Sequence, residues 1–363
     1  LTVGKVSILG INAYHNEAII SIFPYIDNDR IVTTYLFKVL PLIAQNGDTK
    51  TAIKGATLNS DSLSNLLIPI PPISEQRRIV DKITELEPSV NAYEKAETQL
   101  SALNTTFPEA LKKSILQQAV MGKLVPQNPD DEPASVLLER IRAEKQALVK
   151  AGKIKKDKND SVIYRRDNSH YEMVGGVERC IDEEIPFEIP ESWVWVHLGS
   201  LLSVRGGKRL PLGEKLVTEK TDHVYIRVTD MKRNTVDLSD LHYITDKVYA
   251  QISSYIITKD DLYIVIVGST IGKVGIIPNE LDGMNLTENA ARLSPYQVDK
   301  HFLLRVLTTD LLQNQFFDKT HQVGQPKLAL ERLKTAYIPL PPLAEQNRIV
   351  SKIEELFKIC ENL

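Results

Sequence analysis

A segment of nineteen residues that occurs twice, 270 positions apart, is the strongest constraint on how this chain can fold. Ile68–Leu86 reads IPIPPISEQRRIVDKITEL and Ile338–Leu356 reads IPLPPLAEQNRIVSKIEEL, with the same residue at 13 of 19 positions. A weaker similarity, at nearly the same offset, relates Gly4–Val6 to Gly272–Val274. We therefore expect two β-rich domains, each followed by a proline-rich junction and a helix. The first unit should lack its beginning, and the second should stop soon after its helix starts.

The repeated junction predicts an extended segment that runs directly into a helix. Proline removes a backbone N–H and disfavours α geometry in the residue before it, so Leu67–Ile70 should be extended. Pro72 suits the first position of a helix, where the missing N–H costs nothing. Glu75 and Glu345 would then lie in the first helical turn, where the helix dipole favours an acidic side chain.

After the first junction, apolar residues follow the heptad spacing of a helix that packs lengthwise on another helix. These positions are Ile79, Ile83, Leu86, Val90, Tyr93, Leu100 and Leu103. Pro88 predicts a kink or a restart. Thr106 and Pro108 predict the cap and first position of a second helix that ends at Gly122, and Pro133–Lys150 predicts a third.

From Ile185 onward, short β-branched and aromatic runs bounded by Gly, Asp and Pro predict strands. These runs are Trp193–Leu198, Val224–Val228, Tyr263–Val267 and Val274–Ile277, and His301–Phe317 predicts an apolar-faced helix. We therefore expect an α+β fold, with part of a first domain over residues 1–67 and a helical region over 68–165. A second domain would cover residues 166–337, and a second helix would begin within 338–363.

The composition argues against several classes of protein. Cys180 and Cys360 are the only cysteines, which excludes a disulfide framework and a CxxC zinc site. No apolar run approaches the roughly 18 residues of a membrane span. We expect a cytoplasmic protein that binds no membrane and has no metal or cofactor of its own. Gly268–Lys273 lacks the spacing of a phosphate loop, so we interpret it as a turn between two strands.

Three polar clusters in the second domain carry side chains suited to DNA contact, although the net charge of −3 argues against a polybasic binder. Two glycines between the first arginine and lysine would let a loop approach a phosphate backbone. A second basic cluster follows an apolar run, and glutamines of a third could pair with adenine. The candidate contacts are Arg205, Lys208, Arg209, Arg227, Lys232, Gln322, Gln325 and Lys327. Solvated loops of an ordinary domain also account for each cluster taken singly.

The doubled junction, together with Lys113–Val125 between its copies, resembles the DNA-specificity (S) subunit of type I restriction-modification systems over essentially the whole chain. The resemblance implies mixed α/β target-recognition domains joined by long coiled-coil spacer helices. Residues 1–67 would be the C-terminal part of the first recognition domain and 68–165 the first spacer. Residues 166–337 would be the second recognition domain, and 338–363 the start of the second spacer.

The same resemblance implies a non-catalytic subunit that binds a bipartite target in double-stranded DNA. Its partners would be methyltransferase (M) and restriction (R) subunits, which would bind S-adenosylmethionine, ATP and Mg²⁺. Paired helices of fixed length would set the gap between the two half-sites.

Two alternatives remain open from the sequence. The chain could be the specificity part of a fused methyltransferase or nuclease whose catalytic domain lies upstream of Leu1. It could instead be a coiled-coil adaptor that binds protein. Binding through several DNA phosphates weakens steeply as salt rises, which separates a DNA reader from a protein adaptor.

Overall fold

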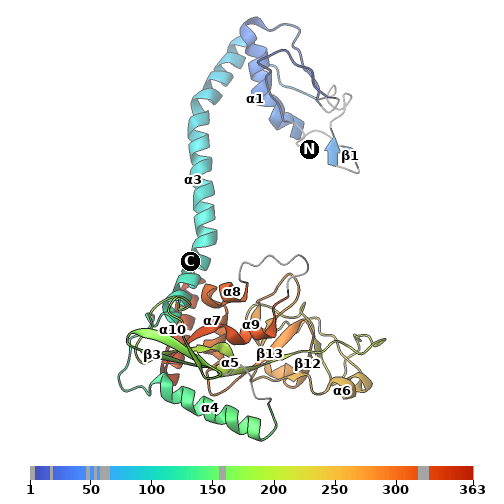
Figure 1. The fold of residues 1–363 in the computed structure, drawn as a ribbon. Coiled ribbons are helices and arrows are strands. Elements are labelled where there is room, and N and C mark those ends of the chain that lie inside the picture. Colours follow the sequence, from blue (N-terminus) through green and yellow to red (C-terminus); the bar gives the residue numbers. More distant parts are fainter. Residues whose placement is uncertain are drawn as a thin grey trace. The chain divides into compact units, whose positions relative to one another are not determined.

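A computed structural model describes residues 5–16, 19–45, 50–52, 55–57, 66–154, 161–317 and 327–362 of the chain. They belong to two compact units, Leu1–Leu103 and Asn104–Leu363. The 48-residue helix α3 (Ile73–Val120) contributes residues to both units (Figure 1). The expected α+β class is confirmed. None of the described helices combines the length and the apolar composition of a membrane span.

The described residues of the first unit form one main helix and a small hairpin, besides the first part of α3. Its elements are η1 (Asn28–Arg30), α1 (Ile31–Gln45), β1 (Lys50–Ala52) and β2 (Gly55–Thr57). The Tyr35 hydroxyl of α1 donates to the carbonyl of Pro69 at 2.8 Å. Lys38 of α1 forms an ion pair with Glu87 of α3. These contacts attach α1 to the proline-rich junction and to the helix that follows it.

The second unit contains most of the regular structure. Its helices are α4 (Ala134–Lys150), α5 (Leu198–Leu201), α6 (Asp246–Ile252), η2 (Asn279–Leu281), α7 (Lys300–Leu307), α8 (Asp310–Phe316), α9 (Leu330–Thr335) and α10 (Leu343–Cys360). A four-stranded antiparallel sheet has the order β11 (Val274–Ile276), β10 (Leu262–Val265), β13 (Ala290–Pro295), β7 (Leu202–Gly206). A second sheet has the order β8 (Tyr225–Ile226), β12 (Met284–Leu286), β9 (Ile256–Ile257). Strand β14 (Tyr337–Leu340) pairs with β6 (Val194–His197), and β3 (Ser161–Arg166), β4 (Ser169–Val174) and β5 (Val177–Cys180) form a third antiparallel sheet.

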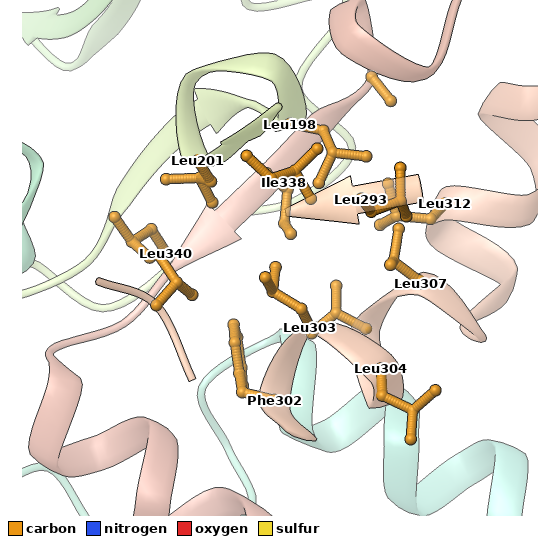
Figure 2. Packing of buried hydrophobic residues seen from close by; sticks show 14 of the residues in the cluster. Leu198, Leu201, Leu293, Phe302, Leu303, Leu304, Leu307, Leu312, Ile338 and Leu340 are labelled. Atoms are coloured by element: carbon orange, nitrogen blue, oxygen red, sulfur yellow. The ribbon is translucent and has the colours of Figure 1, made fainter. Parts of the chain in front are cut away.

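Both faces of the four-stranded sheet are buried, because successive side chains of a strand point to opposite faces. Leu262 and Ile264 of β10 join the largest core cluster, whereas Tyr263 and Val265 join a second cluster with residues of β8 and β12. Figure 2 shows part of the largest cluster, where leucines from α5, α7 and α8 converge on strands β13 and β14. The second domain is therefore a stable platform for the loops at the ends of its strands.

The expected strands of the second domain are confirmed, but the predicted helix His301–Phe317 is in fact two helices. Thr308 ends α7, and Thr309 is the N-cap of α8. Their hydroxyls donate to the carbonyls of Arg305 and Val306 at 2.7 and 2.6 Å, which closes α7. Side-chain bonds of this kind compete with the helical backbone pattern.

The sequence prediction missed the β3–β4–β5 sheet, although the signals for its turns are present. Asp167 and Asn168 have φ of 51° and 64°, and Gly175 and Gly176 have φ of 58° and 87°. Two consecutive residues with positive φ are typical of the tight turns that join antiparallel strands. The polar composition of the strands concealed this signal.

Helix α3 runs without a break through Pro88 and Pro108, so the predicted restart and the separate helix at Thr106 are wrong. Contacts on either side of the prolines hold the helix. Glu87 is paired with Lys38, and beyond Pro108 the side chain of Leu111 packs against the core cluster of the second unit. The predicted end at Gly122 is confirmed by its φ of 69° and by the bond from the Lys123 N–H to the Gln118 carbonyl at 2.9 Å.

The predicted lengthwise packing is not found along Val90–Leu103 of α3. Val90, Tyr93, Leu100 and Leu103 are exposed, and within the described ranges no helix covers them. Further along α3, outside the predicted heptad positions, residues of the helix share the core cluster with α10; they are Ile115, Leu116, Ala119 and Val120. Figure 1 shows α7, α8 and α10 gathered around this end of α3.

Candidate nucleic-acid interface

The loop after β7 is fixed to the start of β13 and to the end of β12 by one backbone hydrogen bond each. The Gly207 N–H donates to the Ala290 carbonyl at 3.0 Å, and the Lys208 N–H donates to the Leu286 carbonyl at 2.9 Å. A Cβ atom at position 207 would lie 2.1 Å from the Thr287 carbonyl oxygen. Glycine is therefore required here for close contact with the chain's own backbone, whereas the sequence had suggested an approach to a phosphate.

The three basic side chains of this loop differ in their partners. The exposed Arg205 donates from Nη2 to the Lys153 carbonyl at 2.9 Å. Lys208 Nζ lies 5.2 Å from the ring centroid of Tyr255. Arg209 pairs with Glu288 at 2.9 Å, although 80% of its side chain is exposed.

Arg227 and Lys232, from the second predicted cluster, are committed to contacts within the protein. Arg227 forms ion pairs with the buried Asp230 at 2.6 Å and with Asp240 at 3.1 Å. The hydrogen bonds that Arg227 donates to the Asp230 carboxylate raise the pKa of Arg227, which keeps the guanidinium charged. Lys232 lies 3.6 Å from Asp237. These ion pairs stabilise the turn that follows β8. A DNA contact by Arg227 or Lys232 stays a prediction.

The third predicted cluster is described only at Lys327, because Gln322 and Gln325 lie outside the described residues. Lys327 forms a β-bridge with Val267, and the Leu328 N–H donates to the Ile266 carbonyl at 2.9 Å. The Ile266 N–H in turn donates to the Asn289 carbonyl at 2.8 Å. Asn289 precedes Ala290, whose carbonyl accepts the hydrogen bond from Gly207. The segments that contain Lys327 and Lys208 therefore lie at the same end of the four-stranded sheet.

The glycine-rich segment Gly268–Lys273 is a turn between β10 and β11, as predicted. Gly268 and Gly272 have φ of 109° and 82°. Lys273 Nζ donates to the Met231 carbonyl at 3.2 Å, so this amine is used within the fold. A Cβ atom at position 272 would lie 2.4 Å from the Gln313 side chain, which explains the second glycine.

A second polar cluster, which the sequence did not reveal, joins the β3–β5 sheet to β6 and β14. The buried Glu172 carboxylate contacts His197 Nε2 at 2.6 Å and accepts from Arg179 Nη2 at 2.6 Å. Burial raises its pKa, but the hydrogen bonds from His197 and Arg179 outweigh this effect and leave the pKa lowered. The Tyr337 hydroxyl donates to Glu184 at 2.6 Å. Each of these groups has a partner, which is typical of a structural anchor.

The described residues contain no group of three or more His, Cys, Asp or Glu side chains that could hold a metal ion. No catalytic cluster was predicted from the sequence. The exposed cations at the sheet end are therefore the main candidate site within the described ranges.

Comparison with known proteins places these features in a family. The family model for the type I restriction modification DNA specificity domain matches residues 1–101 and 190–363. The chain is 32% identical over 345 residues to the type I restriction enzyme EcoAI specificity subunit of Escherichia coli, covering 82% of this chain and 54% of that protein. It is 25% identical over 347 residues to the EcoBI specificity subunit of the same organism, covering 93% and 61%.

The crystal structure of an HsdS subunit from Thermoanaerobacter tengcongensis is similar to 91% of this chain and 63% of that chain, with 17% identity and a TM-score of 0.41. The chain thus spans between half and two thirds of the length of these three proteins. Because the family model matches most of the sequence, including both copies of the repeated junction, the chain belongs to the type I restriction-modification DNA specificity family.

Proposed function

We propose that this chain is the DNA-recognition subunit of a type I restriction-modification complex and that its second unit contacts one half of a bipartite duplex target. One observation carries the proposal. The match to the DNA specificity domain over residues 190–363 includes the sheet end where Arg205 and Lys208 are exposed. Cations in such positions fix a protein on a phosphate backbone.

The eight predicted residues remain our proposed DNA contacts, in an order that the structure suggests. Arg205 and Lys208 come first, because no described carboxylate lies within ion-pair distance of either side chain. Lys327 shares their end of the sheet, and Arg209 is exposed but paired. Arg227 and Lys232 follow, since contact with DNA would compete with their internal ion pairs. Gln322 and Gln325 complete the set.

In this proposal the chain performs no catalysis and directs partner subunits to the DNA in the cytoplasm. Methyltransferase and restriction subunits would supply the chemistry, with S-adenosylmethionine, ATP and Mg²⁺ bound to them. The recognition of DNA rather than protein would show as a steep loss of binding with rising salt.

The test is to express the chain with its methyltransferase subunits in a host and to map methylated adenines across the genome. We expect a split motif that is methylated on both strands only when the chain is present. A pattern that does not depend on the chain, or no methylation by an assembled complex, would contradict the proposal.

A further inference from the structure

A pocket of about 370 Å³ lies at the edge strand β7, on the same strand as the exposed Arg205. This volume is within the range of pockets that accept small ligands. Its lining comes from β7, from the segment leading into β9 and from β12 and β13. The lining residues are Arg205, Gly206, Gly207, Ser254, Tyr255, Ile256, Leu286 and Arg292.

Two arginines stand directly opposite each other in this lining. Arg205 of β7 and Arg292 of β13 are partners in the antiparallel register. Like charges at such positions repel each other. Arg292 has compensation, because its Nε lies 3.9 Å from Asp261 and its Nη1 donates to the Ile256 carbonyl at 2.7 Å.

Arg205 lacks this compensation. Its guanidinium donates to the neutral Lys153 carbonyl, and among the described residues no carboxylate lies within ion-pair distance. Of the two opposed arginines, only Arg292 therefore has a described carboxylate, Asp261, within ion-pair distance. The Arg205 guanidinium has no such ion pair among the described residues and can accept an anion.

An aromatic ring lines the same pocket, and a third cation lies over that ring. Lys208 Nζ is 5.2 Å from the Tyr255 ring centroid, and Tyr255 is 37% exposed. Gly206 and Gly207 have no side chains, so the backbone itself forms part of the wall. The lining contains no Asn or Gln amide of the kind that reads adenine. Its cations and backbone groups are of the kind that contacts phosphate and sugar.

We propose that this pocket binds one backbone phosphate of duplex DNA. The Arg205 guanidinium donates to the phosphate oxygens, Lys208 adds charge at the rim, and Tyr255 packs against the adjoining sugar. Arginine matches phosphate geometry with two parallel hydrogen bonds, whereas lysine acts as a point charge. The assignment rests on the proposed function, since it takes duplex DNA as the ligand.

The test measures how the Kd of the full chain for a mixed-sequence duplex depends on salt. Each phosphate contact adds about one to the slope of log Kd against log salt, so Arg205→Ala and Lys208→Ala should each lower the slope by about one. At low salt, we expect Arg205→Ala to weaken binding about tenfold, the effect of one charged hydrogen bond. Arg205→Lys should keep most of the slope but bind more weakly.

Lys247→Ala is the matched control, because Lys247 is a similarly exposed cation of the same unit that pairs with Glu214. It should leave both Kd and slope unchanged. Thermal unfolding should be the same for all four variants, since the three altered side chains are exposed. Wild-type slopes in both Arg205→Ala and Lys208→Ala would overturn the pocket assignment and leave the proposed function standing.

Two further measurements identify the ligand of the pocket. A wild-type chain that binds no duplex would overturn the proposed function and the pocket with it. Inorganic phosphate alone distinguishes a DNA phosphate from a free anion. We expect it to compete with the duplex only at concentrations where ionic strength explains the loss. Saturable phosphate binding that Arg205→Ala abolishes without any change in duplex binding would overturn the assignment.

Discussion

The two copies of the repeated junction share their local geometry but differ in what surrounds them. In each copy the glutamine amide donates to the carbonyl of the first of two adjacent prolines: Gln76 to Pro71 at 2.8 Å, and Gln346 to Pro341 at 3.0 Å. This bond explains why Glu-Gln follows Pro-Pro at a fixed distance. The sequence motif thus determines how the helix starts, independently of its surroundings.

The neighbouring residues of the motif behave differently in the two units. Glu345 is fully buried and accepts from Trp193 Nε1 at 2.9 Å and from Gln127 Nε2 at 2.6 Å. Arg348 donates to both carboxylate oxygens of Asp131, at 3.1 and 2.5 Å. The equivalent residues of the first copy, Glu75 and Arg78, are exposed. The same residue types therefore make hydrogen bonds within the fold in one copy and are exposed in the other. Matched substitutions can measure how much each copy contributes to stability.

The largest contrast is expected at the central isoleucine of the repeat. Ile349 is 1% exposed within the core, whereas Ile79 is only partly buried. Ile349→Ala should destabilise the second unit by about 3 kcal/mol through the lost burial and the cavity that it leaves. Ile79→Ala should cost less than about 1 kcal/mol. Calorimetry of both variants gives the two losses of stability. Equal losses would show that the isoleucine contributes equally in the two copies.

The glutamines should show a smaller contrast. Gln346 Oε1 accepts the Asp299 N–H at 3.0 Å, whereas Gln76 Oε1 has no hydrogen-bond partner among the described residues. Gln346→Ala leaves a buried N–H and a carbonyl unpaired, so we expect a loss of about 2 kcal/mol against about 1 kcal/mol for Gln76→Ala. Denaturant unfolding gives the values. A greater loss at Gln76 would mean that its Oε1 atom has a partner that the described residues do not reveal.

The arginines of the two copies, Arg348 and Arg78, should show a still smaller difference in their contributions to stability. Arg348→Ala leaves the largely buried Asp131 carboxylate without its partner, for an expected loss of about 1 to 2 kcal/mol because Arg348 itself is partly exposed. Arg78→Ala should change stability by no more than about 0.5 kcal/mol. Trp193 and Trp195 are the only tryptophans, so their fluorescence reports unfolding of the second unit alone. An unchanged fluorescence transition in Arg348→Ala would show that the ion pair contributes nothing.

The smallest effect concerns pH. Burial raises the pKa of Glu345, partly offset by hydrogen bonds from Trp193 and Gln127, so the folded chain keeps a proton that the unfolded chain releases near 4.5. This group favours folding at low pH and loses its contribution as pH rises through the raised pKa. Glu345→Gln should therefore make stability fall less over that pH range. Unfolding midpoints measured across this pH range give the dependence of stability on pH. An equal pH dependence in the wild type and in Glu345→Gln would contradict the raised pKa of Glu345.

The contribution of Asp131 to stability depends on pH in the opposite direction. The hydrogen bond from Arg348 lowers its pKa below the usual 3.8, so its contribution is present above that value and is lost as pH falls through the lowered pKa. Arg348→Ala should remove this acid-side loss. It should also raise the pKa of Glu345 further, because the Arg348 charge lowers that pKa in the wild type.

The repeat made the starts of both junction helices predictable from sequence. Periodicity and turn residues also predicted α4, the end of α3 at Gly122 and the main strands of the second unit. The continuity of α3 through Pro88 could not be predicted, because it depends on distant packing such as the pair between Lys38 and Glu87. Tertiary contacts override local proline signals in this way.

The candidate site was only partly accessible to sequence reasoning. Clusters of Arg, Lys and Gly marked the loop after β7, but their charge balance depends on strand register and on distant acids. Register alone places Arg205 opposite Arg292, which was not a candidate from sequence, and a residue 79 positions away neutralises Arg209. Likewise, the anchor at Glu172 joins strands that are remote in the chain.

The most direct test of the central claim is selection from a pool of random duplexes by the full chain, alone and with its methyltransferase subunits, followed by sequencing. We expect enrichment of a defined sequence, with affinity at least about a thousandfold above that for scrambled duplex at physiological salt. Arg205→Ala and Lys208→Ala should weaken binding to the selected and the scrambled duplexes alike, because phosphate contacts carry no sequence information. Recovery of an unbiased pool by the assembled complex would contradict the account.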